Sequence, residues 1–132
     1  MEQQTSYSFG RTLDRPFEQV LTDAREALAK EEFGILSEID VRAKFAEKLA
    51  IEFRPYTILG ACNPKLAHRA LSSEIALGTL LPCNVVVWAE DDGRTTVMAM
   101  DPVPTMQMIA NPALDEIAAE VRQRLERALA QL

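Results

Sequence analysis

The sequence predicts an α+β fold in which amphipathic helices cover one face of a curved antiparallel sheet. Three observations predict this class: an apolar hairpin pattern near residue 90, helical patterns of which three carry an apolar stripe, and strands and helices that follow one another without a linker. The hairpin requires antiparallel pairing, which excludes a doubly wound parallel sheet. We expect residues 1–132 to form a single domain, because this length is usual for one domain.

The first third of the chain alternates between strand and helix patterns. Residues 7–13 combine aromatic and β-branched residues in a loose alternation that predicts the first strand. A helix is predicted from Asp14 onward, with Pro16 tolerated in its first turn. Gly34 suits the C-terminal cap that would end this helix. The alternation over residues 35–41 then predicts the second strand.

The middle of the chain contains two helix starts and a strand between them. Residues 42–50 predict a short helix that Asp40 is able to cap. Residues 55–61 predict a third strand that is apolar on both faces and therefore central. Asn63 and Pro64 mark the next helix start, with the asparagine as cap and the proline in the first helical position.

The last third predicts a hairpin and a long helix. Residues 83–90 are the strongest strand pattern, and residues 94–100 return as its antiparallel partner after a short turn. Asn111 and Pro112 begin the final helix by the same combination of cap and proline. Its apolar residues keep helical spacing to the end of the chain, so one stripe faces a core.

The hairpin predicts two different apolar faces for the sheet. One face carries Val85, Val87, Val97 and Ala99, and the other carries Trp88, Met98 and Met100. Helices that cover only one face would leave the other too apolar to remain in water. A subunit interface or a ligand cleft would cover it, and we therefore expect a homodimer.

Charge and composition exclude several classes of partner. The net charge is −6, and the basic residues are scattered among acidic ones, so we expect no binding to nucleic acid or to an anionic membrane surface. No run approaches the roughly 18 apolar residues of a membrane-spanning helix. The first residues lack the pattern of a secretory signal, and two cysteines make a thin disulfide framework. We expect a cytoplasmic protein with reduced thiols.

The two cysteines occupy similar settings, and each is followed by an asparagine. Cys62 precedes a helix start, where the partial positive charge of the helix favours a thiolate. Cys83 begins an apolar strand. Burial as a small apolar residue is the main alternative for both thiols, and it is the stronger interpretation for Cys83.

Other chemistries find little support in the sequence. His68 and Glu74 would complete a four-ligand set with the two cysteines, but no recognised zinc spacing is present, and we expect no metal site. There is no glycine-rich loop of the kind that holds phosphates, although Gly60 ends a strand just before a helix. No motif identifies a cofactor.

The most plausible ligand site surrounds the two Cys-Asn turns and the strand before the first of them. Arg54 and Tyr56 on that strand are suited to an anionic or planar ligand, although Arg54 would equally pair with an acidic side chain. The candidate ligand-site residues are Arg54, Tyr56, Gly60, Asn63, Pro64, His68, Glu74, Pro82 and Asn84, and the candidate reactive thiols are Cys62 and Cys83.

The stretch from Arg54 to Val87 resembles a known family. It contains Arg54-Pro55-Tyr56, then Leu59-Gly60-Ala61-Cys62-Asn63-Pro64, and then Leu80-Leu81-Pro82-Cys83-Asn84 followed by three valines. In these features the chain is similar to the bacterial and archaeal family called domain of unknown function 302, and the similarity extends over nearly its whole length. The resemblance implies a fold of the TATA-binding-protein-like or helix-grip type, in which a curved antiparallel sheet grips a long C-terminal helix. It also implies a homodimer and no established activity.

Two functions remain as hypotheses from the sequence. The first is a binding protein, rather than an enzyme, that holds a small and partly apolar molecule between sheet and helix. The second is a thiol-dependent redox protein that uses Cys62, with Cys83 as resolving partner. A purely structural role for the two Cys-Asn turns in a dimer is the third interpretation.

Overall fold

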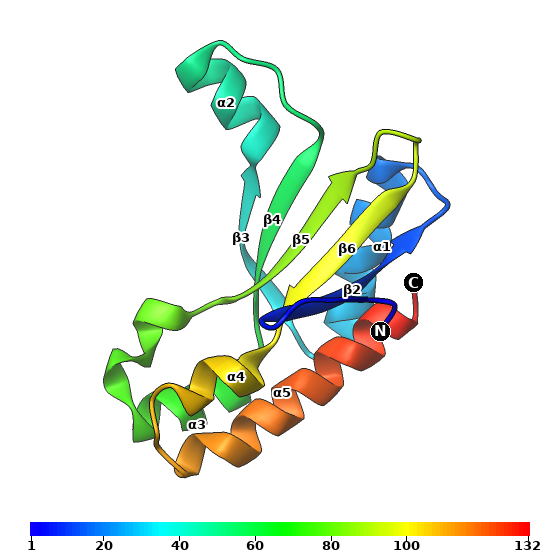
Figure 1. Cartoon of the computed structure of the whole chain (residues 1–132). Helices are drawn as coiled ribbons and strands as arrows, with labels where there is room; N and C mark the ends of the chain where they lie inside the picture. Colours follow the sequence, from blue (N-terminus) through cyan, green and yellow to red (C-terminus); the bar gives the residue numbers. More distant parts are fainter.

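The computed structural model describes all 132 residues as a curled six-stranded antiparallel sheet with helices against one face and at one end (Figure 1). The predicted α+β class is confirmed. The strands are β1 (Gln3–Gln4), β2 (Ser8–Leu13), β3 (Gly34–Asp40), β4 (Tyr56–Cys62), β5 (Cys83–Ala89) and β6 (Thr95–Met100). The helices are α1 (Phe17–Lys30), α2 (Val41–Leu49), α3 (Pro64–Ser73), the 3-10 helix η1 (Ile75–Leu80), α4 (Pro102–Gln107) and α5 (Ala113–Ala130).

The sheet has the strand order β1-β2-β6-β5-β4-β3, and every neighbouring pair is antiparallel. The predicted hairpin is present, with Val85 opposite Ala99 and Val87 opposite Val97. Gly93 lies in its turn at a φ of 89°, a conformation that glycine adopts without steric cost. Strand β4 is internal, as predicted, whereas β3 forms one edge of the sheet.

The core lies between one face of the sheet and helices α1 and α5. The hairpin side chains that face these helices, Val85, Val87, Val97 and Ala99, are completely buried. The predicted stripe of α5 packs against them, and its Leu114, Leu125 and Ala128 are also completely buried. In Figure 1, α1 lies behind the strands and α5 runs diagonally below them, and no helix covers the front of β4, β5 and β6.

Two of the predicted caps, Asp40 and Asn63, are present, and the N-cap of α5 is Pro112, one residue after the predicted Asn111. The carboxylate of Asp40 accepts a hydrogen bond from the Ala43 amide at 2.9 Å. The side-chain oxygen of Asn63 accepts one from the Leu66 amide at 3.2 Å. Asn111 accepts one from the Ala113 amide at 3.1 Å, just outside the first turn of α5. Each of these side chains accepts a hydrogen bond from an amide at a helix start, where the amide has no partner within the helix. Such a residue therefore favours the start of a helix at that point in the chain.

Some details differ from the prediction. Gly34 does not cap α1: the helix ends at Lys30, Glu32 adopts the positive φ of 67°, and Gly34 already pairs with Cys62 as the first residue of β3. The short strand β1 and the short helix α4 were not predicted. Helix α4 forms over a segment rich in proline because Pro102 occupies its first turn and Asp101 accepts a hydrogen bond from the Val103 amide at 3.0 Å.

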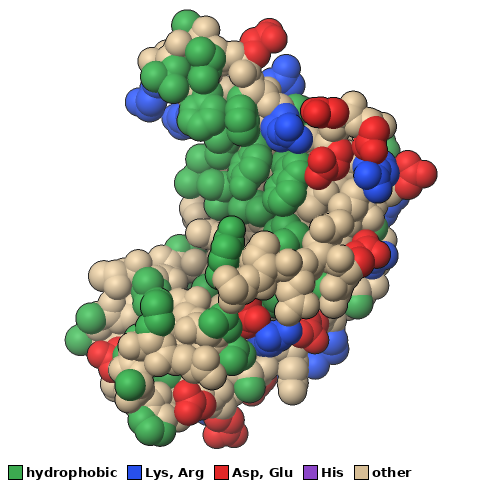
Figure 2. All heavy atoms as spheres, in the orientation of Figure 1, with side chains coloured by type: hydrophobic (Ala, Val, Ile, Leu, Met, Phe, Trp, Pro, Cys, Tyr) green, Lys and Arg blue, Asp and Glu red, His purple; other side chains and the backbone are tan.

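Helix α2 stands apart from the rest of the molecule. In Figure 1 it projects beyond the ends of β3 and β4 as an arm, and it has no buried residue. Figure 2 shows the open face of the sheet hollowed between this arm and the opposite end of the molecule, with apolar side chains in the hollow.

None of the helices has the length and the apolar composition that a membrane-spanning helix requires.

Candidate functional site

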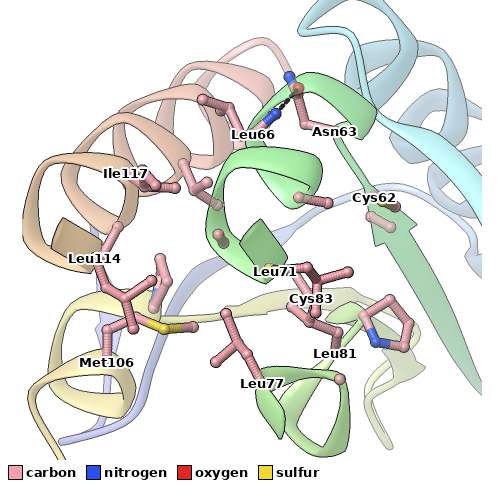
Figure 3. A pocket seen from close by; sticks show the side chains of 18 of the residues that line it. Cys62, Asn63, Leu66, Leu71, Leu77, Leu81, Cys83, Met106, Leu114 and Ile117 are labelled. Atoms are coloured by element: carbon pink, nitrogen blue, oxygen red, sulfur yellow. Dashed lines mark hydrogen bonds between the residues drawn. The ribbon is translucent and has the colours of Figure 1, made fainter. Parts of the chain in front are cut away.

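A pocket of about 350 Å³ lies at the end of the sheet where β4 finishes and β5 begins. Residues of α3, η1, α4 and α5 surround it (Figure 3). Its 20 lining residues are Phe33, Leu36, Ala61, Cys62, Asn63, Leu66, Ala67, Ala70, Leu71, Leu77, Gly78, Leu81, Pro82, Cys83, Pro102, Met106, Leu114, Ile117, Ala118 and Val121. None of them carries a charged side chain.

Local sequence places the walls of this pocket. The Asn63 cap and Pro64 fix the start of α3, and the helical period then turns Leu66 and Ala70 inward. On α5, Leu114, Ile117, Ala118 and Val121 follow the spacing of one helix face and form the opposite wall. Figure 3 shows the labelled Leu71, Leu77, Met106 and Leu114 converging on the same space.

The ends of α3 and α5 are tied together beside the pocket. The side-chain amide of Asn111 donates to a carboxylate oxygen of Glu74 at 3.2 Å and to the backbone carbonyl of Ser73 at 3.4 Å. Glu74 thus has a structural partner outside the pocket, and it does not line it. These bonds hold two walls of the pocket at a fixed separation.

The polar capacity of the pocket is small. Asn63 is 6% exposed, and its side-chain oxygen is already engaged by the Leu66 amide (Figure 3). Apart from Asn63, the lining side chains with hydrogen-bonding capacity are the two thiols, which are weak donors and acceptors, and the Met106 thioether, which is a weak acceptor. A charged group placed here would lose its hydration without gaining a partner. The pocket therefore suits an uncharged, apolar group.

Cys62 and Cys83 both line the pocket and are free thiols. Cys62 ends β4 and is half-buried, whereas Cys83 begins β5 and is buried. Burial raises the pKa of the Cys62 thiol, which is opposite to the prediction that the helix start would favour a thiolate. Burial, with a smaller contribution from neighbouring Cys62, raises the pKa of Cys83 to about 11. Burial therefore lowers the fraction of thiolate at Cys62.

The structure brings some of the predicted site residues together. Cys62, Asn63, Pro82 and Cys83 all line the pocket. Gly60 lies next to them, in β4, where Ser37 and Pro82 pack against its backbone. A β-carbon at this position would lie 2.2 Å from the Ser37 hydroxyl oxygen and 2.8 Å from Pro82. Glycine is therefore required here for packing, and not for holding a phosphate.

Other predicted residues lie elsewhere. Pro64, His68 and Asn84 are exposed and do not line the pocket. Arg54 and Tyr56 lie near the opposite end of β4. Arg54 donates to the Ala89 carbonyl at 3.1 Å and forms ion pairs with acidic residues of the hairpin, Glu90 at 3.9 Å and Asp91 at 3.5 Å.

Tyr56 stacks on a neighbouring aromatic residue instead of lining the pocket. Its ring lies parallel to that of Trp88, with 5.7 Å between ring centroids. Tyr56 is thus engaged by Trp88, and Arg54 by acidic residues of the hairpin, so both predicted site residues make their contacts at the hairpin end of the sheet. The single site predicted around the two Cys-Asn turns is therefore divided between two ends of β4.

Most of the pocket wall was not among the predicted site residues. Leu77, Met106, Leu114 and Ile117 are buried apolar residues that the sequence presents as ordinary core. The pocket has the ends of β4 and β5 on one side and the long helix α5 on the other, as the first hypothesis assumed, and α3, η1 and α4 supply the rest of its wall. No local sequence signal distinguishes a leucine that fills a core from one that borders a cavity.

No group of three or more histidine, cysteine or acidic side chains is placed to hold a metal ion.

Comparisons with known proteins agree on the family. The family described as domain of unknown function DUF302 matches residues 9–132. A solved structure of an uncharacterized conserved DUF302 protein from Bacillus stearothermophilus is similar to the chain, with 32% sequence identity and a TM-score of 0.88. The similarity covers 96% of this chain and 98% of that one. No curated protein matches the chain.

Proposed function

Since the chain belongs to the DUF302 family, whose description names no activity, we propose from the pocket itself that this protein binds a small, uncharged apolar molecule. The observation that carries the proposal is an apolar pocket of about 350 Å³ without a charged lining residue. Binding pockets for small molecules in proteins commonly have volumes of roughly 300–1,000 Å³ and mostly apolar walls. A purely structural core is packed without voids of this size.

The lining chemistry defines the ligand class. An aliphatic or aromatic hydrocarbon group carries no charge, so its burial in the pocket leaves no charge without a partner. It would also displace water that has few polar partners in the pocket. Leu36 and Gly78 are the exposed residues of the lining and mark its open side. Any polar end of the ligand would lie on this side, in contact with solvent.

A fluorescent apolar probe tests the proposal. N-phenyl-1-naphthylamine is neutral and gains fluorescence in an apolar site, so titration of the wild-type protein should give saturable binding. Ala118 lies on the inner wall and is 3% exposed, so Ala118→Leu should fill part of the pocket and weaken probe binding about tenfold or more. Ala67→Phe fills the pocket from α3 and provides a second test if Ala118→Leu destabilises the fold.

The matched control is Ala119→Leu, one residue along α5. Ala119 is exposed and does not line the pocket, so the same substitution there should leave probe affinity unchanged. Circular dichroism of each variant verifies that it is folded. Equal affinity for the probe in Ala118→Leu, Ala67→Phe and Ala119→Leu would exclude this pocket as the binding site.

We also propose that this binding protein is a homodimer. The support is the uncovered face of the sheet, which presents Tyr56, Ile58, Val86 and Trp88 as half-buried apolar side chains. An apolar face of this kind is typical of a protein interface.

A thiol-dependent redox function is the alternative. Its support is that both cysteines line the same pocket, on adjacent strands, with Cys83 opposite the neighbour of Cys62 in the sheet. We rank it second because burial raises the pKa of both thiols, which lowers the fraction of the reactive thiolate.

A further inference from the structure

The pocket has a deep wall and an outer wall of different make-up. Every lining residue that belongs to α4 or α5 is buried, so these two helices form the deep wall. The exposed or half-buried lining residues, which form the outer wall, are Leu36, Cys62, Ala67, Leu71, Gly78, Leu81 and Pro82. Three of them lie in residues 75–82, which comprise η1 and its connection to β5 and which we call the outer segment.

The outer segment has no side-chain hydrogen bond or ion pair with the rest of the molecule. Its Thr79 hydroxyl donates to the Ala76 carbonyl at 2.9 Å, within the segment itself. The Leu81 amide likewise donates to the Gly78 carbonyl, at 3.3 Å. Polar contacts therefore do not hold the segment in place over the pocket.

Both ends of the outer segment are fixed, in contrast to its middle. On one side, the Asn111 side-chain amide donates to a Glu74 carboxylate oxygen at 3.2 Å. On the other side, Cys83 pairs with Ala61 in the sheet. The segment is thus a strap between two anchored points, and its middle is able to move without displacing α3 or β5.

One buried side chain holds the middle of this strap against the pocket. Leu77 is the buried residue of η1, with 2% exposure, and it points from η1 into the pocket (Figure 3). Ile75, two residues earlier, is 84% exposed. The six residues of η1 form a 3-10 helix, whose hydrogen-bond geometry is poorer than that of an α-helix. Apolar burial, chiefly of Leu77, therefore keeps the segment closed.

Helix α4, the other short helix at the pocket, is held more firmly. Its cap residue Asp101 is 7% exposed and forms an ion pair with Arg122 of α5 at 2.7 Å. Its two lining residues, Pro102 and Met106, are both buried. Opening the pocket at α4 would break this ion pair, whereas opening it at η1 breaks no polar contact with the rest of the molecule. Movement of η1 is the less costly route.

We propose that the outer segment is the lid of the pocket, and that an apolar ligand enters when Leu77 withdraws. The lid rests on the proposed binding function and assigns the route by which the ligand reaches its site. Opening is local, because both ends of the segment stay fixed. Minor conformations of this kind typically make up about 0.1–10% of the molecules at equilibrium.

Two readouts test the lid in the Leu77→Ala variant, which removes most of the buried anchor. In stopped-flow mixing with N-phenyl-1-naphthylamine, the association rate constant should rise about tenfold, because a larger fraction of molecules is open. Alkylation of Cys83 by iodoacetamide should accelerate by a similar factor without any ligand, since this thiol is buried in the pocket directly after the outer segment.

The matched control is Leu114→Ala, which removes the same atoms from the deep wall on α5. Leu114 is completely buried, so this variant should lose at least as much global stability as Leu77→Ala. Faster labelling of Cys83 in Leu77→Ala than in Leu114→Ala therefore reports local opening rather than global unfolding. If circular dichroism shows that either variant is unfolded, Leu77→Val and Ile117→Val repeat the comparison with smaller changes.

The two proposals fail in different ways. Labelling of Cys83 that is no faster in the Leu77 variant than in its deep-wall control would overturn the lid, whatever the probe does. A wild-type protein that shows no saturable probe binding would overturn the proposed function. In that case, labelling of Cys83 still decides whether the outer segment opens, because it requires no ligand.

Discussion

Cys62 and Cys83 illustrate how environment decides the chemistry of a residue. Both lie at positions that the sequence predicts: Cys62 comes just before the start of α3, and Cys83 is the first residue of β5. The helix start was expected to favour ionisation of Cys62, but burial raises the pKa of its thiol. Cys83 is 8% exposed, and its pKa rises to about 11.

The raised pKa values predict slow thiol reactivity. At neutral pH both thiols should be protonated, and since only the thiolate is nucleophilic, each should react with iodoacetamide more slowly than in the unfolded protein. The labelling rate should rise with pH, and Cys83 should react more slowly than half-buried Cys62. Timed alkylation with mass spectrometry at several pH values measures both rates. Rapid labelling of Cys62 that persists below pH 7 would instead favour the redox function.

At the scale of single elements, the pairing of β2 with β6 depends on one close approach. Gly10 lies opposite Met98, whose side chain folds over it and becomes 7% exposed. A β-carbon at Gly10 would lie 1.8 Å from the Val97 carbonyl oxygen and 2.8 Å from the Met98 α-carbon. Because these are backbone atoms, a change of rotamer does not relieve the contact.

Gly10→Ala should therefore destabilise the fold strongly. The two strands must separate to admit one methyl group, and we expect a loss of about 3 kcal/mol or more in the free energy of unfolding. Chemical denaturation followed by circular dichroism measures this loss. Gly78→Ala is the control, because a β-carbon at Gly78 meets nothing within 4 Å. Similar stability for the two variants would contradict the close contact at Gly10.

At the scale of the whole molecule, packing is unevenly distributed. Helices α1 and α5 bury full apolar stripes, and ion pairs of α5 with the end of α1 join them, including Arg124 with Glu32 at 2.9 Å and Arg127 with Glu31 at 2.9 Å. Helix α2 has no buried residue. The proposed ligand pocket and the arm lie at opposite ends of β4, so changes at one should leave the other intact.

This uneven packing predicts the pattern of amide hydrogen exchange. Amides of α2 should exchange much faster than those of α1 and α5, because local opening of α2 exposes little buried apolar surface. In the wild-type protein the proposed dimer should also slow exchange in β4 and β5, whose uncovered face supports the proposal. Mass spectrometry of peptic fragments measures both. Protection of α2 equal to that of α1 and α5 would contradict this uneven packing.

Much of the fold follows from local patterns. Asn63 before Pro64 predicts a helix start because both residues meet the requirements of a first helical turn, whatever the tertiary context. The alternation in β5 predicts its two faces for the same reason, and Val85 and Val87 are completely buried as expected. Gly34 was misassigned because Glu32 supplies the positive φ that usually selects glycine, and Arg124 from a distant helix pairs with it.

The sequence by itself determined the class of the fold, the hairpin, the helix starts and the presence of a second apolar face, since each depends on residues close together in the chain. Only the tertiary structure decided where a cavity remains, because a void depends on how four helices fail to fill the end of a sheet. It also decided that Arg54 pairs with the hairpin, that burial raises the pKa of Cys62, and that α2 projects uncovered. Each of these depends on which distant side chains surround a residue, and spacing along the chain contains no measure of that.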